Sequence, residues 1–220
     1  MKWNAETVQK LLPFLTLIGL FVILSIASPN FLTPVNLSSV VRQTATINIM
    51  ALGMTFVIVS GGIDLSVGSV LAFSAVCGTM AMKTGLGVPG GIVVGMLGGL
   101  LWGFLNGAMV TGLRIPPFIV TLGTMGIVRG VTLLITSGQP VAELPRSFSY
   151  LGEGRVGPFP FVLVVLILCT VITHIALKRT KLGRYTYAIG SNESAAVYAG
   201  IPVNRYKIWA YCILGALKFV

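Results

Sequence analysis

Charged residues are scarce in this chain of 220 residues, because Asp, Glu, Lys and Arg together make up only 9% of it. A water-soluble domain usually carries about 25% charged residues. Apolar residues instead reach 55%, and the mean hydropathy is +0.94. This composition excludes an ordinary soluble globular protein and predicts a protein that crosses a membrane several times.

Residues that commonly bind metals are also scarce. The chain has one His, His174, and three Cys that all lie in apolar runs: Cys77, Cys169 and Cys212. A structural zinc site needs about four Cys, His or carboxylate ligands, and the sequence contains no CxxC pair. No metal site and no cofactor are therefore predicted, and the cysteines are interpreted as small apolar core residues.

Catalytic sequence patterns are missing as well. The chain contains no HExxH, GxSxG or Walker A sequence, patterns that supply a metal-bound water, a serine nucleophile and a phosphate-binding loop. We therefore do not expect an enzyme. If the protein depends on ATP, another chain must bind and hydrolyse it.

Acidic residues are the rarest charged group, with five against fifteen Lys and Arg, which gives a net charge of +10. Such an excess can indicate a nucleic-acid partner. Here the cations lie between apolar runs rather than on one face of a soluble domain, so no nucleic-acid binding is expected. The excess of Lys and Arg in cytoplasmic loops of membrane proteins explains the charge better.

Long apolar runs are abundant and predict an all-α transmembrane bundle. A helix needs about 20 apolar residues to cross the hydrocarbon core. We predict about six full spans and a truncated seventh that begins near Ile208. The first span is interpreted as an uncleaved anchor, because its apolar core is longer than that of a signal peptide and more spans follow. The six are Leu11–Ala27, Leu37–Val59, Leu65–Met82, Val88–Val110, Pro116–Thr136 and Pro158–Leu177.

The distribution of Lys and Arg predicts the orientation. With the N-terminus in the cytoplasm, nine cations fall at inner ends and three at outer ends, which satisfies the positive-inside rule. The segment 178–207 is then cytoplasmic, and 137–157 is extracytoplasmic. The outer cations are Lys83, Arg146 and Arg155; the inner ones are Lys2, Lys10, Arg114, Lys178, Arg179, Lys181, Arg184, Arg205 and Lys207.

The fourth span carries a glycine at every fourth position. This spacing places the glycines on one helix face, where small residues let another helix approach closely in lipid. Packing within one chain is favoured over a seam between two copies. Asn106 lies beside the stripe and could form a hydrogen bond across the bundle or contact a polar solute. The glycines are Gly91, Gly95, Gly99, Gly103 and Gly107.

Two charged residues lie where a membrane protein rarely keeps charge. Asp64, within the segment 61–66 that joins the second and third spans, suits the N-cap of the following helix, and a role in a gate can coexist with that capping. The glycines of this segment favour a tight reversal of the chain. Arg129 lies inside the fifth span, where a cation is either functional or extends toward the outer surface.

The basic segment 178–207 contains a short helix with clear boundaries. Ser191 and Asn192 are both good N-cap residues, and Glu193 places a carboxylate in the first turn. Gly200 fits the position after the helix, and Pro202 prevents its continuation. We predict a helix of about two turns from Asn192 to Ala199. It is either a connector lying on the membrane or, as we favour for so long a loop, a helix that docks on a partner.

Two blocks of residues resemble a known family. One is Met-Ala-Leu-Gly-Met-Thr at 50–55, followed by Gly-Gly-Ile-Asp-Leu-Ser-Val-Gly-Ser at 61–69. The other runs from Thr-Lys-Leu-Gly-Arg-Tyr at 180–185 through Ala-Ile-Gly-Ser-Asn-Glu at 188–193 to Ala195-Ala196 and Gly200-Ile201. With these blocks, the sequence resembles the permease subunit of bacterial ABC sugar importers of the ribose, xylose and arabinose branch, over nearly the whole chain.

The resemblance implies a membrane-spanning permease that performs no covalent chemistry. Its implied partners are a cytoplasmic ATPase, a periplasmic sugar-binding protein, a second permease copy (identical or paralogous) and the lipid of the bacterial inner membrane. The pattern E-x-A-A-x3-G is similar to the family's coupling helix, which docks on the ATPase. The coupling residues implied are Gly183, Arg184, Gly190, Asn192, Glu193, Ala195, Ala196 and Gly200, and those of a translocation path or gate are Asp64, Ser66, Asn106 and Arg129.

The end of the sequence departs from the resemblance. Family members continue with further spans, whereas Lys218-Phe219-Val220 replaces a pattern of small residues. We therefore expect residues 1–220 to form one permease domain that is incomplete at its C-terminus and does not transport alone. The expected function is ATP-driven import of a monosaccharide such as ribose. The alternatives are a secondary carrier driven by an ion gradient and a non-transporting membrane fragment.

Overall fold

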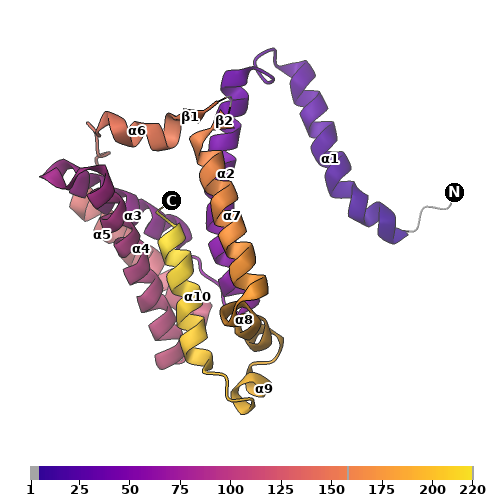
Figure 1. Ribbon diagram of the computed structural model, residues 1–220, viewed down its shortest axis with the longest axis vertical. Coiled ribbons are helices and arrows are strands. Elements are labelled where there is room, and N and C mark those ends of the chain that lie inside the picture. Colours follow the sequence, from indigo (N-terminus) through magenta and orange to yellow (C-terminus); the bar gives the residue numbers. More distant parts are fainter. Residues whose placement is uncertain (1–4, 158, 220) are drawn as a thin grey trace. The chain divides into compact units, whose positions relative to one another are not determined.

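The computed structural model describes residues 5–157 and 159–219, and almost all of its regular structure is helical. The chain divides within α2 into two compact units, Met1–Gln43 and Thr44–Val220. Figure 1 shows the elements in chain order. They are α1 (Ala5–Ala27), α2 (Pro34–Val59), α3 (Val67–Ala81), the π-helical turn η1 (Met82–Leu86), α4 (Gly87–Gly112), α5 (Pro117–Thr136), α6 (Arg146–Glu153), β1 (Arg155–Val156), β2 (Phe159–Pro160), α7 (Phe161–Arg179), α8 (Lys181–Ser191), α9 (Glu193–Tyr198) and α10 (Val203–Leu217).

The first unit contains α1, the connection that follows it and the beginning of α2. In this connection the side-chain amide of Asn36 donates a hydrogen bond to the backbone oxygen of Phe31 at 2.7 Å. The ring of Phe31 also meets that of Phe21 edge to face, with centroids 5.0 Å apart. These contacts define the turn between the two helices.

The all-α architecture of a membrane protein is confirmed, but the count of six full spans plus a seventh is not. In the described part of the chain, four helical segments are long and apolar enough to cross a membrane, and Leu11–Ala27 is a shorter apolar helix. The third and fourth predicted spans belong to one such segment. The four are Pro34–Val59, Val67–Gly112, Pro117–Thr136 and Phe161–Arg179.

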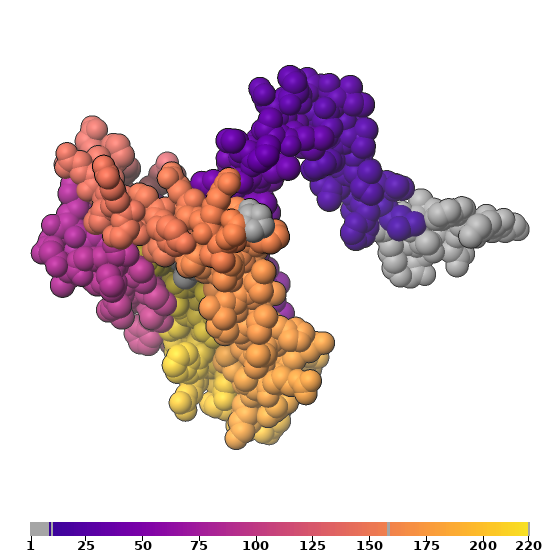
Figure 2. Space-filling model, turned by 45° about the horizontal axis from the view of Figure 1, so that its top comes forward, coloured from indigo at the N-terminus to yellow at the C-terminus, as the bar shows by residue number. Residues whose placement is uncertain are grey.

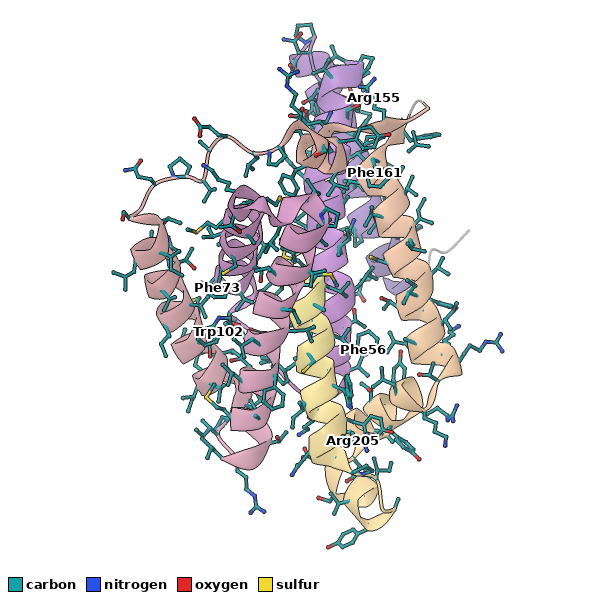
Figure 3. All side chains as sticks on the ribbon, turned by 60° about the vertical axis from the view of Figure 1, so that its left-hand side comes forward. Phe56, Phe73, Trp102, Arg155, Phe161 and Arg205 are labelled. Carbon is teal, nitrogen blue, oxygen red and sulfur yellow. The ribbon has the colours of Figure 1, made fainter. Side chains whose placement is uncertain are left out.

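The segment Val67–Gly112 reverses direction near its middle. Gly85 has a φ of 95° and Gly87 a φ of 64°, values that glycine adopts without strain. The reversal lets α3 and α4 lie side by side, and a Cβ on Gly91 would meet the backbone oxygen of Gly78. The rings of Phe73 in α3 and Trp102 in α4 meet at right angles farther along this pair, with centroids 6.1 Å apart (Figure 3).

The glycine stripe of α4 is buried against helices of the same unit. A Cβ on Gly99 would meet the backbone oxygen of Gly215, and a Cβ on Gly103 would meet that of Tyr211, so α10 contacts α4 through backbone. Phe219 occupies the space beside Gly95. The structure therefore assigns the stripe to packing within one chain, the interpretation that the sequence favours.

The third predicted span begins later than expected, because residues 61–66 are not helical. The helix α3 starts at Val67 and has only 15 residues, which corresponds to about 22 Å against a hydrocarbon core of about 30 Å. Ser66, just before α3, contacts Asn106, which lies about 9 Å along α4 from the end of that helix. The chain turns at Gly61, where φ is 79° and the N–H of Gly62 bonds to the Val57 oxygen. Residues 62–66 then enter the bundle without regular secondary structure.

The two ends of the second unit carry different groups of cations. At one end the Lys83 ammonium donates a hydrogen bond to the backbone oxygen of Ala142 at 3.1 Å and lies 3.7 Å from the Glu143 carboxylate. Arg155 lies at this end and Arg205 at the opposite end (Figure 3). Figure 2 shows α8, α9 and the start of α10, in light orange to yellow, gathered at that opposite end.

Candidate functional site

A buried chain of hydrogen bonds joins the segment 61–66 to α4 and α5. One oxygen of Asp64, Oδ1, accepts hydrogen bonds from the backbone N–H of Ser66 at 2.7 Å and from its hydroxyl at 2.6 Å. The Asn106 amide nitrogen donates to the Ser66 hydroxyl at 3.1 Å. The Thr124 hydroxyl then donates to the Asn106 amide oxygen at 2.6 Å. We call Asp64, Ser66, Asn106 and Thr124 the polar network.

The polar network is closed to solvent within the chain. Asp64 is 3% exposed and Thr124 is 2% exposed, while Ser66 and Asn106 have no exposed surface. A buried polar group without a partner costs free energy, so these mutual hydrogen bonds stabilise the arrangement and fix the relative positions of three elements. Three of these residues, Asp64, Ser66 and Asn106, are among those that the sequence analysis selected for a translocation path or gate.

The sequence did not predict Thr124 as a member. Its only signal was a hydroxyl on the same side of the fifth span as Val120 and Val128, one turn away on either side. All three residues are buried in α5. A threonine at such a spacing is equally typical of a hydroxyl bonded to its own helix, so the sequence could not distinguish the two.

Asp64 does not cap α3, which corrects the prediction. The N-cap residue is Ser66, whose side chain makes no capping hydrogen bond to α3. The carboxylate of Asp64 accepts the N–H of Ser66 itself, outside the helix. Because residues 61–66 turn inward before α3 begins, the carboxylate of Asp64 reaches the interior of the bundle instead of the first turn of the helix.

The second oxygen of Asp64 has a cationic partner that sequence reasoning missed. The Lys218 ammonium lies 2.9 Å from Asp64 Oδ2, and neither side chain has any exposed surface. The Tyr211 hydroxyl, also in α10, donates a hydrogen bond to the backbone oxygen of Ile63 at 3.1 Å. The segment 61–66 is therefore attached to α10 at two adjacent residues.

Arg129 is not part of this assembly. It lies on the exposed side of α5, whereas its neighbour Val128 and the network residue Thr124 face the interior of the unit. The structure therefore brings Asp64, Ser66 and Asn106 together and leaves Arg129 apart from them.

The short helix α9 has the boundaries that the sequence predicts. The Asn192 side chain accepts a hydrogen bond from the backbone N–H of Ala195 at 2.9 Å. At the other end, the N–H of Gly200 bonds to the Val197 oxygen and the N–H of Ile201 to the Ala196 oxygen, both at 3.0 Å. Gly200 has a φ of 77°. These bonds form a Schellman motif, which terminates the helix sharply.

The faces of α9 divide the predicted coupling residues into two groups. Ala196 is 4% exposed and packs with Ile189 of α8 and Val203 of α10, so it anchors the helix to its own chain. Ala195 is exposed. The most exposed large side chains of α9 are Val197, at 56%, and Tyr198, at 90%. The sequence analysis did not select these two residues, although they form the outward surface.

Glu193 connects α9 to the start of α10. Its carboxylate lies 2.7 Å from the Lys207 ammonium. The same two residues line a cavity of about 510 Å³, which Gly61 and Arg114 also line. The beginning of the segment 61–66 and the start of α9 therefore share one cavity at this end of the unit.

The other predicted coupling residues lie on or next to α8, a helix that the sequence analysis treated as loop. Gly183 lies against the backbone oxygen of Leu177 and Gly190 against that of Val59, so neither position has room for a Cβ. Arg184 is exposed. The glycines and cations obscured a helical pattern in which Gly183, Thr186 and Ile189 form the buried face.

Comparisons with known proteins agree on one family. The family described as "Branched-chain amino acid transport system / permease component" matches residues 36–217. The chain is 41% identical over 212 residues to the ribose import permease protein RbsC of Bacillus subtilis (strain 168), with 96% of this chain and 66% of that protein covered. No solved structure shows a significant match.

Two further relatives carry similar descriptions. The ribose import permease protein RbsC of Escherichia coli (strain K12) is 37% identical over 207 residues, which cover 92% of this chain and 64% of that protein. The L-arabinose ABC transporter permease protein AraH of Azospirillum brasilense is 35% identical over 196 residues, 89% of this chain and 58% of that protein. The chain thus spans less than two thirds of the length of these relatives.

Proposed function

Since the chain belongs to the family of transport-system permease components, we propose that it is a permease subunit of an ATP-driven importer for a monosaccharide such as ribose. The observation that carries this proposal is its similarity to ribose and arabinose permeases along nearly all of its length. The proposal includes a bacterial inner-membrane location and a cytoplasmic N-terminus, which the distribution of cations supports.

The partner that supplies the free energy is a cytoplasmic ATPase, which docks on α9. Three features support this docking: the helix is capped at both ends, it is anchored through Ala196, and it presents Tyr198 away from the unit. An exposed aromatic residue on a rigid helix is typical of a protein interface. In this proposal Gly183, Gly190, Asn192 and Gly200 shape the docking surface by positioning α8 and α9, and Arg184 and Glu193 provide charge beside it.

The gate of the proposed path is the segment 61–66, which contains Asp64 and Ser66 and is held by Asn106. Non-helical backbone at membrane depth occurs where protein or a water-filled cavity covers it, and transporters place such segments at their substrate pathways. Arg129 belongs to the path on a different ground. A cation within an apolar helix is costly against lipid, so its exposed side of α5 is proposed to face water or the second permease copy.

The proposed function is tested by reconstituting a permease that contains this chain with the ATPase and binding protein of the same importer in lipid vesicles. We expect binding of sugar to stimulate ATP hydrolysis and Gly200→Asp to abolish that stimulation. A Cβ at the φ of 77° of Gly200 adds strain, and a carboxylate at the C-terminal end of α9 opposes the helix dipole. Stimulation of the variant equal to that of the unmodified chain would remove α9 from the coupling role. Uptake that stops when an uncoupler is added at constant ATP would instead indicate an ion-driven carrier.

A further inference from the structure

The helix α10 carries an ion pair near each of its ends. Near its start, Lys207 pairs with Glu193 of α9 at 2.7 Å, and just after its end Lys218 pairs with Asp64 at 2.9 Å. The two lysines are separated by about 16 Å along the helix axis. One pair is partly exposed, with the Glu193 side chain 55% exposed, whereas the other is fully buried. The helix α10 therefore connects α9 to the segment 61–66 within the bundle.

The packing of α10 fixes the position of Lys218. Backbone contacts at Gly99 and Gly103 hold α10 against α4 without intervening side chains. On another side of the helix, a Cβ on Gly53 of α2 would lie 2.9 Å from Leu214 Cα. Contacts this close prevent α10 from rotating freely, because backbone atoms cannot yield as flexible side chains do. The tightly packed α10 thus holds the Lys218 ammonium group beside Asp64.

The buried pair also completes the hydrogen bonding of the Asp64 carboxylate. Asp64 uses Oδ1 for Ser66 and Oδ2 for Lys218, so both oxygens of the carboxylate are satisfied. Removing one partner of a buried pair leaves the other charge without compensation, which costs far more than replacing both partners by neutral groups. Removal of Lys218 would therefore leave the buried Asp64 carboxylate without a compensating charge and without its link to the end of α10.

We propose that Lys218 is a positioning residue that ties α10 to the segment 61–66, so that α10 acts as a strut between α9 and the polar network. A displacement of α9 moves α10 through Val203 and Lys207, and Lys218 transmits it to Asp64 and Ser66. This proposal rests on the proposed docking of an ATPase at α9, whereas the ion pair itself can be tested on the chain alone.

The ion pair is tested by a double-mutant cycle on the full chain in detergent or lipid nanodiscs. Lys218→Met and Asp64→Asn should each lower the unfolding temperature, and the double variant should be more stable than either single variant, because no buried charge is left unpaired. Lys207→Met, which breaks the partly exposed pair, is the matched control and should change the unfolding temperature less. Single effects that simply add in the double variant would overturn the pair.

The attachment is tested by hydrogen–deuterium exchange of the backbone amides of residues 61–66. Lys218→Met should accelerate their exchange several-fold and Lys207→Met should not. The double variant, although restored in stability, should still exchange rapidly, because the connection to α10 is absent. Unchanged exchange in both Lys218 variants would show that the pair neutralises charge without holding the segment, and would overturn the strut.

The transmission step is tested by adding the ATPase subunit of the same importer with and without ATP. In the unmodified chain ATP should change the exchange of residues 61–66, and in Lys218→Met this change should be lost while the ATPase remains bound. An ATP-dependent change that persists in Lys218→Met overturns the strut and leaves the proposed function intact. Failure of the ATPase to bind the unmodified chain overturns the proposed function and the strut with it.

Discussion

Individual glycines determine how closely α10 approaches α4. At Gly103 the missing side chain allows contact with the backbone oxygen of Tyr211, and at Gly99 with that of Gly215. In lipid the hydrophobic effect does not drive helices together, so such close packing supplies much of the association free energy. The same contacts position Tyr211 and Lys218 beside the segment 61–66. They thereby connect the glycine stripe to the candidate gate.

The first prediction concerns one residue of this stripe. Gly103→Ala should destabilise the protein by about 1–3 kcal/mol, because the new methyl group would overlap backbone atoms of α10 that cannot move independently. The measurement is the free energy of unfolding in mixed detergent micelles. Gly126→Ala in α5 is the control, since a Cβ there meets nothing within 4 Å, and it should be neutral or slightly stabilising. Equal effects of the two substitutions would contradict the packing role.

At the scale of single elements, α9 is defined by its caps but oriented by its contacts. Asn192 and Gly200 fix where the helix begins and ends. Ala196 then turns one face toward α8 and α10, so that Tyr198 points outward. Val197 and Tyr198, which the E-x-A-A-x3-G pattern does not mark, are thus available to a partner beside the exposed Glu193 and Ala195, whereas Ala196 is not.

The second prediction follows from that exposure. Tyr198→Ser should weaken binding of the ATPase subunit by about tenfold, equivalent to about 1.4 kcal/mol, because a large apolar contact is lost from the interface. Binding is measured by titrating the labelled ATPase onto the chain in nanodiscs. Tyr187→Ser on α8 is the matched control, because this tyrosine is also exposed, at 51%, but lies outside α9. Unchanged binding of the Tyr198 variant would place the interface elsewhere, and equal losses in both variants would extend it over α8.

The elements also show what could be predicted from the sequence and what could not. The ends of α9 and the role of the glycine stripe follow from local rules: N-cap residues, glycine after a helix and the period of a helix face. The pairing of Lys218 with Asp64 joins residues 154 positions apart, so no local rule reveals it. The late start of α3 was missed because Leu65 continues the apolar run of the predicted span, although the helix begins only at Val67.

At the scale of the whole molecule, the positions of the cations and the direction of the helices agree within the second unit. Lys83, Ala142 and Glu143 meet at one end, and Arg114, Glu193 and Lys207 line one cavity at the other. The alternation of predicted spans had placed Lys83 at the outer end and Arg114 and Lys207 at the inner end. The end that carries α9 is the more basic one, which agrees with the proposed orientation.

The third prediction tests this orientation directly. A single cysteine at Tyr198 should react with a membrane-impermeant maleimide in inverted membrane vesicles but not in intact spheroplasts, and a cysteine at Ser149 in α6 should show the reverse. Both are introduced into a chain whose Cys77, Cys169 and Cys212 are replaced by Ala, so that each variant carries one thiol. Both positions lie in the second unit at its opposite ends, so reaction of both from the same side would contradict the span arrangement itself. Reaction of each from the side opposite to that expected would instead keep the arrangement and invert it, which would place α9 out of reach of a cytoplasmic ATPase.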